Sequence, residues 1–387
     1  MIRLQQYVIE TSKKAHAPGV SEVLGLDVGS TFIKTARLAS GRIQRETFQR
    51  SPMPSFVAPV FLGSCWVAPD ALFAALNMAI EADVAAHGVP KEIYVSGQMH
   101  GATLCEVDSV EPLVPISTWQ DRSARDFDAG KRWQDVNSAL TPELLAKTGN
   151  ELDFGHPLVV MPFLMSQLTD GSKKLRFTSL ISLVAEYLVN QPVSSHLSDA
   201  AASGMYDPFT QTWVPELLDL AGVGDVNLPE TTEQVIAVGR TKNDTRVFVG
   251  VGDHQASLFG GESGEVDSAR EICINVGTGA QISSLNPKLG GNHRLRPKLG
   301  GGFFATIPDL PAGRELSSGA VTFSGAAEAY MAAAELIHEG EIESVALTGS
   351  IFGKAPEFAR VIEEAFGAPV RITEDEPALS GLARLAN

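Results

Sequence analysis

The chain has 387 residues, 44% of them hydrophobic, which is enough apolar surface to bury large cores and favours two domains over one. The formal net charge of −16 disfavours a general nucleic-acid surface, because such a surface needs clustered Lys and Arg. A bound anion would have to be held locally, by backbone N–H groups, a metal ion or a few placed cations.

The three cysteines, Cys65, Cys105 and Cys273, are odd in number and far apart. They support neither a disulfide framework nor a structural zinc site, and a reducing cytoplasm fits them best. Residues 1–22 lack the continuous apolar core of a signal peptide, and we expect them to form a short N-terminal extension. No later run reaches the roughly 18 apolar residues of a membrane span, so we expect no membrane partner.

The first half of the chain begins with strand signals. "VLGLDVGSTFIKTARL" predicts two β-strands joined by a Gly turn, and "RETFQR" a third. "PDALFAALNMAIEADVAAHG" has the apolar spacing of a helix that stops at Gly88. "EIYVSGQMHGATLCEV" predicts a strand, a loop and a strand, and residues 120–240 are mostly helical in pattern, which indicates a cap or insertion.

The second half starts a new cycle of strands and helices. "RVFVGVG" predicts a strand, "DHQASLFGG" a helix and "EICINVGTGAQISSL" a hairpin. The helix "SGAAEAYMAAAELIHEG", the strand "SVALTGS" and the helix "APEFARVIEEAFG" follow. The alternation predicts an α/β architecture in each lobe, with a domain boundary near residue 245 that separates 23–245 from 246–387.

A first candidate site lies in the hairpin Asp27-Val28-Gly29-Ser30-Thr31, which Lys34 follows. Gly at the bend lets the backbone approach a polyphosphate, Ser30 and Thr31 offer hydroxyl and amide donors, and Asp27 can hold Mg²⁺ through water. The alternative is an ordinary hairpin whose Asp satisfies its own turn.

A second hairpin, Asn275-Val276-Gly277-Thr278-Gly279, echoes the first after 248 residues. Gly277 and Gly279 bracket the hydroxyl of Thr278, and Asn275 takes the place of Asp27. A repeat on the scale of a domain predicts two similar α/β lobes that each present a Gly hairpin to one shared cleft.

A third constellation is the loop Gln98-Met99-His100, which has Gly on both sides and leaves a strand. Amide and imidazole groups suit sugar hydroxyls, although a lone His after a strand can equally be structural. Downstream, Trp119 and Asp121 place an aromatic face beside a carboxylate, a grouping that suits a polyol. The alternative there is a surface turn with a local Asp–Arg pair.

The fourth constellation is "VGVGDHQAS", in which Asp253 follows a strand and opens a helix. Asp253 could be a simple helix N-cap. At the mouth of a cleft that faces the Gln98–His100 loop, it would be a carboxylate able to accept a hydroxyl proton.

Taken together and in this order, these segments resemble the FGGY carbohydrate kinases of the actin and hexokinase superfamily, over most of residues 23–387. The Gln-Met-His-Gly loop and the Trp-Gln-Asp segment are most similar to sedoheptulokinases and xylulokinases, and "GDHQAS" leans toward the former. The resemblance implies an α/β fold of the two-domain actin/hexokinase-like (ribonuclease H-like) type with a cleft between the lobes. It also implies ATP-dependent phosphorylation of the primary hydroxyl of a small-molecule ketose, such as sedoheptulose or xylulose.

The resemblance also assigns roles to residues. It implies that Asp253 is the catalytic base and that Asp27 and Asp253 hold Mg²⁺. The sugar would contact Gln98, Met99, His100, Trp119 and Asp121. ATP would contact Asp27, Gly29, Ser30, Thr31, Lys34, Gly277, Thr278, Gly279, Gly349 and Ser350.

The chain departs from the family pattern near the expected adenosine site, where Ser350, Ile351 and Phe352 follow Gly349 in place of a run of glycines. The second domain is also short, with the loss between Phe304 and Leu347. A second hypothesis is therefore a sugar-binding or regulatory homologue with weakened ATP binding, and a third is an actin-like ATPase. The sequence does not determine which ketose is used. It does not determine the oligomeric state either, and a homodimer is compatible with it.

Overall fold

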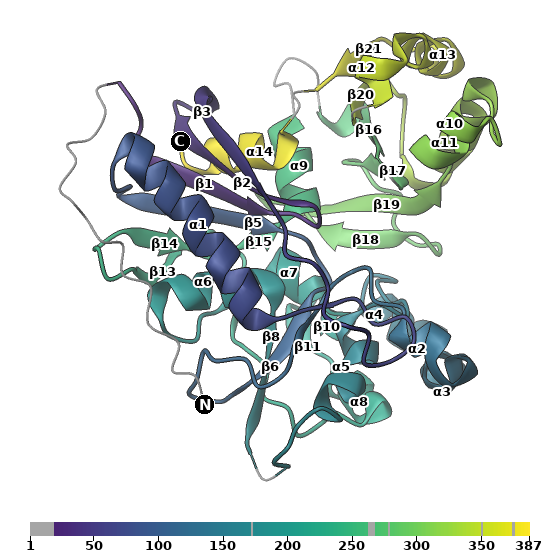
Figure 1. The fold of residues 1–387 in the computed structure, drawn as a ribbon. Coiled ribbons are helices and arrows are strands. Elements are labelled where there is room, and N and C mark those ends of the chain that lie inside the picture. The colour runs from purple at the N-terminus through teal and green to yellow at the C-terminus, as the bar shows by residue number, and fades with distance from the viewer. Residues whose placement is uncertain (1–18, 172, 262–267, 278, 350, 374–375) are drawn as a thin grey trace. The chain divides into compact units, whose positions relative to one another are not determined.

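A computed structural model describes residues 19–171, 173–261, 268–277, 279–349, 351–373 and 376–387. Its contacts group the chain into two compact units. The first contains the residues up to Ala256 together with Leu382–Asn387, and the second is Ser257–Gly381. Each unit has a mixed β-sheet with helices packed on it, so the predicted α/β class is confirmed (Figure 1).

The main sheet of the first unit mixes antiparallel and parallel strands. Its spatial order is β13 (Ala237–Arg240), β14 (Arg246–Phe248), β5 (Glu92–Gly97), β1 (Val23–Val28), β2 (Phe32–Ala39) and β3 (Arg42–Pro52), and β15 (Val251–Gly252) also pairs with β5. The hairpins β1–β2 and β2–β3 are antiparallel, as "VLGLDVGSTFIKTARL" and "RETFQR" predicted. β1, β14 and β15 run parallel to β5, so their carboxyl ends lie at one edge of the sheet.

Helices α1 (Pro69–His87) and α6 (Leu180–Val189) pack on this sheet. In Figure 1, α1 lies along the strands β2 and β3. It begins with Pro69 in its first turn, and it stops at Gly88, as the sequence predicted. The φ of 88° at Gly88 is a conformation that glycine adopts readily. The core that α1 shares with the sheet is apolar, and each buried Leu or Ile contributes about 1.5–3 kcal/mol.

The first unit also contains the region predicted to be mostly helical, and the structure corrects that prediction. Short strands alternate with the helices there, because two-residue strands carry too few residues to show a period of two. The helices are α2 (Ser123–Asp126), η1 (Phe127–Gly130), α3 (Lys131–Ala139), α4 (Pro142–Lys147), α5 (Pro157–Met165), α7 (Leu197–Ala201) and α8 (Pro215–Ala221). The further strands of this region are β8 (Leu175–Ser179), β9 (Ser195–His196), β10 (Tyr206–Asp207), β11 (Thr212–Trp213) and β12 (Thr231–Thr232). Before it, β4 (Trp66–Val67), β7 (Ile116–Ser117) and β6 (Ala102–Glu106) form one antiparallel sheet with β8.

The second unit repeats the strand order of the first. Its sheet runs β18 (Arg294–Pro297), β19 (Phe303–Leu310), β17 (Ala280–Ser284), β16 (Glu271–Val276), β20 (Ser344–Thr348) and β21 (Val370–Ile372). The series β19-β17-β16-β20-β21 has the same sequence of antiparallel and parallel pairings as β3-β2-β1-β5-β14. The internal repeat that the two Gly hairpins predicted is therefore present at the level of whole sheets.

Among the described residues of the second unit, four helices pack on its main apolar core: α10 (Gly313–Ser318), α11 (Phe323–Ile337), α12 (Ile351–Lys354) and α13 (Pro356–Phe366). The short η2 (Ser268–Arg270) precedes β16. Within α9 (Asp253–Gly261) and α14 (Pro377–Leu385) the chain passes from one unit to the other. Among the helices of the described residues, none has both the length and the apolar character that a membrane crossing requires.

The structure places the division between the units later than the sequence did. The predicted boundary near residue 245 comes before β14 and β15, and both of these strands pair with β5 of the first unit. The contacts divide the chain between Ala256 and Ser257, inside α9. The short strands β14 and β15 complete the first sheet, and Asp253 follows directly after β15. Asp253 therefore belongs to the first unit.

Candidate active site

Three neighbouring strands of the first unit end beside one another. In the parallel register, Asp27 of β1 is paired with Ser96 of β5, and Gly252 of β15 is paired with Gly97 of β5. Asp27, the loop that follows Gly97, and Asp253 therefore share one edge of one sheet. The carboxyl edge of parallel strands is where α/β proteins generally bind ligands.

The Asp27 carboxylate is buried and already has two partners. Its Oδ1 accepts a hydrogen bond from the Ser96 hydroxyl at 2.9 Å, and its Oδ2 lies 3.3 Å from Nζ of Lys34 on the paired strand β2. At the tip of this hairpin, Gly29 N donates to Phe32 O at 3.0 Å. Ser30 and Thr31 are exposed there, which leaves their hydroxyls accessible to a ligand.

The loop after β5 is tied to this hairpin. Gln98 donates from its backbone N to Val28 O at 2.9 Å and from Nε2 to Gly29 O at 3.4 Å. Its Oε1 is buried without a hydrogen-bond partner in the described part of the chain. A buried acceptor of this kind usually has a ligand or water to complete it.

Met99 and His100 follow Gln98 in this loop, and their positions are set by close packing and by an uncommon backbone conformation. A Cβ on Gly252 would lie 3.2 Å from both Cγ and Sδ of Met99, so the Gln98–His100 loop packs directly against the residue before Asp253. His100 has φ of +65°, which is uncommon for a residue other than Gly, and its Nδ1 lies 2.7 Å from the carbonyl O of Ala202. Strained backbone held by its surroundings is typical of functional loops.

Asp253 is half-buried at the first residue of α9, where its Oδ1 accepts a hydrogen bond from His254 N at 2.8 Å. The preceding Gly252 donates its N–H to the Ser198 hydroxyl at 3.0 Å, which fixes the end of β15. Sequence reasoning missed Gln255, two residues further along. Its amide N and O are both buried and have no partner among the described residues.

The Trp119–Asp121 segment is only partly open. Trp119 is 39% exposed, so an aromatic face remains accessible. Asp121 is fully buried: its Oδ1 accepts from the backbone N of Ser123 at 2.9 Å and from that residue's hydroxyl, and its Oδ2 accepts from Cys65 N at 3.1 Å. The alternative of a surface turn does not describe this residue, and its predicted contact with a sugar stays a prediction.

Sequence reasoning also missed two residues that lie beside His100. Glu151 Oε1 lies 3.1 Å from Nε2 of His156 and 3.9 Å from Nε2 of His100, and the two imidazole rings are 4.2 Å apart between centroids. A Glu and a His five positions apart in an irregular loop form no recognisable pattern, so the sequence carried no signal for this cluster.

The second hairpin and the predicted adenosine segment belong to the second unit. Gly277 N donates to Gly279 O at 2.8 Å, which closes the β16–β17 turn. Gly349 has φ of +124°, and a Cβ there would lie 2.0 Å from the carbonyl O of Val276. The glycine at 349 is therefore needed for the close approach of β20 and β16. Thr278 and Ser350 lie outside the described residues.

Phe352, which departs from the family pattern, has a structural position. Its side chain is 2% exposed, and its ring stacks on Phe358 with centroids 5.7 Å apart. Ile351 is half-buried and packs against the same core. Phe352 thus completes the core of the second unit.

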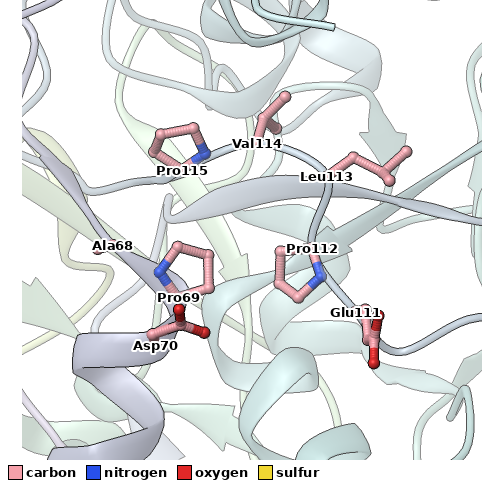
Figure 2. Close-up of a pocket in the computed structure, with 8 residues that line it drawn as sticks. All are labelled: Ala68, Pro69, Asp70, Glu111, Pro112, Leu113, Val114 and Pro115. Atoms are coloured by element: carbon pink, nitrogen blue, oxygen red, sulfur yellow. The ribbon is translucent and has the colours of Figure 1, made fainter. Parts of the chain in front are cut away.

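A surface pocket of the first unit lies apart from the predicted residues. Figure 2 shows it between the start of α1 and the segment before β7. Its lining contains none of the predicted site residues and is largely made of prolines and apolar side chains: Ala68, Pro69, Asp70, Glu111, Pro112, Leu113, Val114 and Pro115. The strand edge therefore remains the better candidate site.

Comparison with known families shows which family the chain belongs to. Residues 22–260 match the model of the N-terminal domain of the FGGY family of carbohydrate kinases, which is more than half of the chain. The chain belongs to the FGGY family. This FGGY chain carries Asp27, the Gln98–His100 loop and Asp253 within the matched segment.

Curated relatives of this FGGY chain are distant. An uncharacterized sugar kinase of Archaeoglobus fulgidus is 24% identical over 67% of the chain and 57% of its own length. An apulose kinase of Pectobacterium atrosepticum is 22% identical over 49% of the chain and 40% of its own length. The chain therefore spans less than two thirds of these relatives.

Solved structures show the same fold. A gluconate kinase of Lactobacillus acidophilus has a TM-score of 0.77 at 18% identity, with 94% of this chain and 88% of that chain covered. A ligand-bound xylulose kinase of the same organism has a TM-score of 0.77 at 17% identity and the same coverage. A glycerol kinase of Plasmodium falciparum, solved with ADP, has a TM-score of 0.74 at 11% identity and covers 94% of this chain and 88% of that one. The predicted two-domain fold of the actin and hexokinase type is confirmed.

Proposed function

We propose that this FGGY protein transfers the γ-phosphoryl group of ATP to the primary hydroxyl of a ketose. The observation that carries the proposal is the parallel register of β1, β5 and β15, which brings Asp27, the Gln98–His100 loop and Asp253 to one sheet edge. Family membership supports the same reaction, because the matched family consists of carbohydrate kinases. Phosphoryl transfer depends mainly on positioning and charge compensation, which such an edge can supply.

In this proposal, Asp253 accepts the proton of the attacking hydroxyl. Its half-buried position at the start of a helix leaves the carboxylate within reach of a ligand. Gln98, Met99 and His100 line the sugar site, and the exposed face of Trp119 stacks on the sugar's C–H groups. Asp121 stabilises this part of the site, because its carboxylate accepts hydrogen bonds from the backbone of Cys65 and Ser123 and so holds the turn that carries Trp119.

The donor set also fits a nucleotide and its magnesium ion. Asp27 and Asp253 are oxygen donors of the kind that Mg²⁺ prefers, and Lys34 with the hydroxyls of Ser30 and Thr31 suits phosphate oxygens. The bound ion would supply neutralising charge at the transferred phosphoryl group. We assign Gly29, Gly277, Thr278, Gly279, Gly349 and Ser350 to the nucleotide site on the strength of the family resemblance.

The substrate is proposed as a sedoheptulose-like ketose, with xylulose next. The support is the Gln-Met-His-Gly loop and the Gly-Asp-His-Gln run, both of which lie at the strand edge. A xylulose kinase shares the fold at 17% identity, and a likeness at this level shows the fold but not the sugar. We therefore base the choice of sugar on the side chains of this loop. One hydroxyl group can be discriminated strongly when buried polar groups must pair with it.

The decisive experiment measures ADP release with a panel of ketoses in the presence of Mg²⁺ and ATP. We expect sugar-dependent turnover that falls by about a hundredfold to ten-thousandfold in Asp253→Asn, as for the loss of a general base. Asp225→Asn is the matched control, because Asp225 is an exposed carboxylate of the same unit outside the site. Turnover that does not depend on sugar, or equal rates for Asp253→Asn and the native protein, would contradict the proposal.

A second candidate function is a sugar-binding homologue with weakened ATP binding. The observation that favours it is the backbone at Gly349, where a Cβ would lie 2.0 Å from Val276 O, so that packing accounts for the glycine without any nucleotide. Calorimetry separates the two functions, because the second predicts sugar binding with little heat from Mg–ATP. Normal nucleotide affinity would count against it.

A further inference from the structure

Three side chains that can ligate a metal converge next to the proposed sugar loop. His100 comes from the loop after β5, Glu151 from the segment after α4, and His156 from the position before α5. Their candidate ligand atoms all lie within 4.8 Å of one another. Glu151 Oε1 is the centre of the group, 3.1 Å from His156 Nε2 and 3.9 Å from His100 Nε2.

The burial of this cluster is unusual for such polar groups. The side chains of Glu151 and His156 are 1% and 4% exposed. Two imidazole nitrogens lie within 4 Å of the buried Glu151 carboxylate, and a bound cation would add a favourable partner for this buried charge.

His156 leaves part of its bonding capacity unused. Its Nδ1 is buried without a hydrogen-bond partner in the described part of the chain. A buried polar atom without a partner costs about 1–3 kcal/mol and is usually completed by a water or another polar group. Nε2, the ring nitrogen that lies beside Glu151, is the candidate ligand atom, and Nδ1 is the second nitrogen of the same ring.

We propose that His100, Glu151 and His156 form a binding site for a divalent transition-metal ion, with zinc as the best fit. Two imidazoles and a carboxylate are a common zinc ligand set that leaves a fourth position open. Ligand bonds of about 2.0–2.1 Å in a tetrahedron put neighbouring ligand atoms about 3.3 Å apart. The observed separations of 3.1 and 3.9 Å lie on either side of that value, so small side-chain shifts close the site.

The surroundings of His100 prepare it for this role. Its Nδ1 lies 2.7 Å from the carbonyl O of Ala202, and a carbonyl can only accept, so Nδ1 carries the proton in the neutral ring. The lone pair then resides on Nε2, the nitrogen that faces Glu151. A carbonyl that orients the second nitrogen of a ligating His is the usual support of a metal site.

The site would also connect metal binding to catalysis. Because His100 belongs to the proposed sugar loop, a bound metal would hold its imidazole away from the sugar, and zinc would inhibit in competition with the ketose. This consequence rests on the proposed function, whereas metal binding itself does not. Both are separable, since binding is measured without ATP or sugar.

The test uses the full chain freed of metal and titrated with Co²⁺, whose visible ligand-field absorption reports coordination. We expect one ion per chain with a tetrahedral spectrum. Glu151→Gln and His156→Gln should each weaken binding by about tenfold or more. His87→Gln is the control, because His87 lies in the last turn of α1, outside the cluster, and should leave binding unchanged.

Absence of the absorption band, or equal Co²⁺ affinity in folded Glu151→Gln and the native protein, would overturn the proposal. If either variant fails to fold, X-ray absorption at the zinc edge of the zinc-loaded native protein decides instead. Two imidazoles and a carboxylate oxygen around zinc support the assignment. Sulfur ligands, or a single imidazole, would place the metal elsewhere in the chain and refute it.

Discussion

The substitution Gly349→Ala tests whether the second hairpin depends on packing or on a ligand. Gly349 has φ of +124°, and an added Cβ would lie 2.0 Å from O, 2.8 Å from C and 3.2 Å from N of Val276. All three atoms are backbone, so no side-chain rotation relieves the overlap. Val276 ends β16, immediately before the Gly277 turn, so any shift reaches the predicted phosphate-binding hairpin.

The magnitude follows from two separate costs. A residue other than Gly held in this φ region costs about 1–3 kcal/mol, and a backbone shift forced by an added methyl group costs about 1–3 kcal/mol more. We therefore expect Gly349→Ala to lower the free energy of unfolding by about 2–6 kcal/mol, a large part of the usual 5–15 kcal/mol of a domain. Urea unfolding followed by circular dichroism measures this change.

Two glycines of the same unit serve as controls. Gly353 lies in α12 with nothing within 4 Å of an added Cβ, so Gly353→Ala should be neutral or stabilise by about 0.5–1 kcal/mol. Gly367 has φ of +62° and open space, so Gly367→Ala should cost only about 1–2 kcal/mol. The reasoning is refuted if Gly349→Ala unfolds at the same urea concentration as Gly353→Ala. Loss of ATP binding at unchanged stability would show that Gly349 serves the nucleotide and not the packing.

Two further predictions concern titration and reactivity. Burial lowers the pKa of His196 to about 4. Between pH 4 and about 6.5 the unfolded chain therefore binds more protons at this residue than the folded chain does. The contribution of neutral His196 to the free energy of unfolding is complete above this window and is lost as pH falls through it. The loss is about 3 kcal/mol, so the stability advantage of the native protein over His196→Gln should shrink by that amount from pH 7 to pH 4, and a constant difference would contradict the assignment. Burial also raises the pKa of the fully buried Cys105 to about 12, whereas Cys65 is only half-buried. A thiol reagent at neutral pH should therefore label Cys65 well before Cys105 in mass spectra of the native protein, and similar labelling rates would show that Cys105 is not shielded.

The repeat and the strand edge could be predicted because their signals are local. Each Gly hairpin is flanked by β-branched and aliphatic runs, which predicted β1–β2 and β16–β17 correctly. The helix α1 shows the apolar spacing of a buried face and a Gly stop at Gly88, where the structure has a positive φ. Patterns that need only a few adjacent residues can be read from sequence.

Other features depend on contacts between distant segments, and no local pattern reports those. The burial of Asp121 involves a hydrogen bond from Cys65, a residue 56 positions away, which no local pattern around Trp119 predicts. Glu151 and His156 flank the segment between α4 and α5 and meet His100, which lies about 50 positions earlier in the loop after β5. The division between the units was placed too early because the predicted strand "RVFVGVG" was assigned to the second domain, whereas β14 and β15 pair with β5 of the first sheet.

The two hairpins have the same antiparallel pairing but differ in charge, and this difference limits which ligands each can bind. In the first, Asp27 and Lys34 face each other in register and form an ion pair. In the second, the same register holds Asn275 and Gln281, two neutral amides. Backbone N–H groups at a Gly turn can serve phosphate oxygens in either hairpin, but only the first adds a carboxylate that can ligate a cation. In the proposed reaction Mg²⁺ would therefore be held by the first unit, where Asp253 also lies, since the second hairpin has Asn275 at the position of the Asp27 carboxylate.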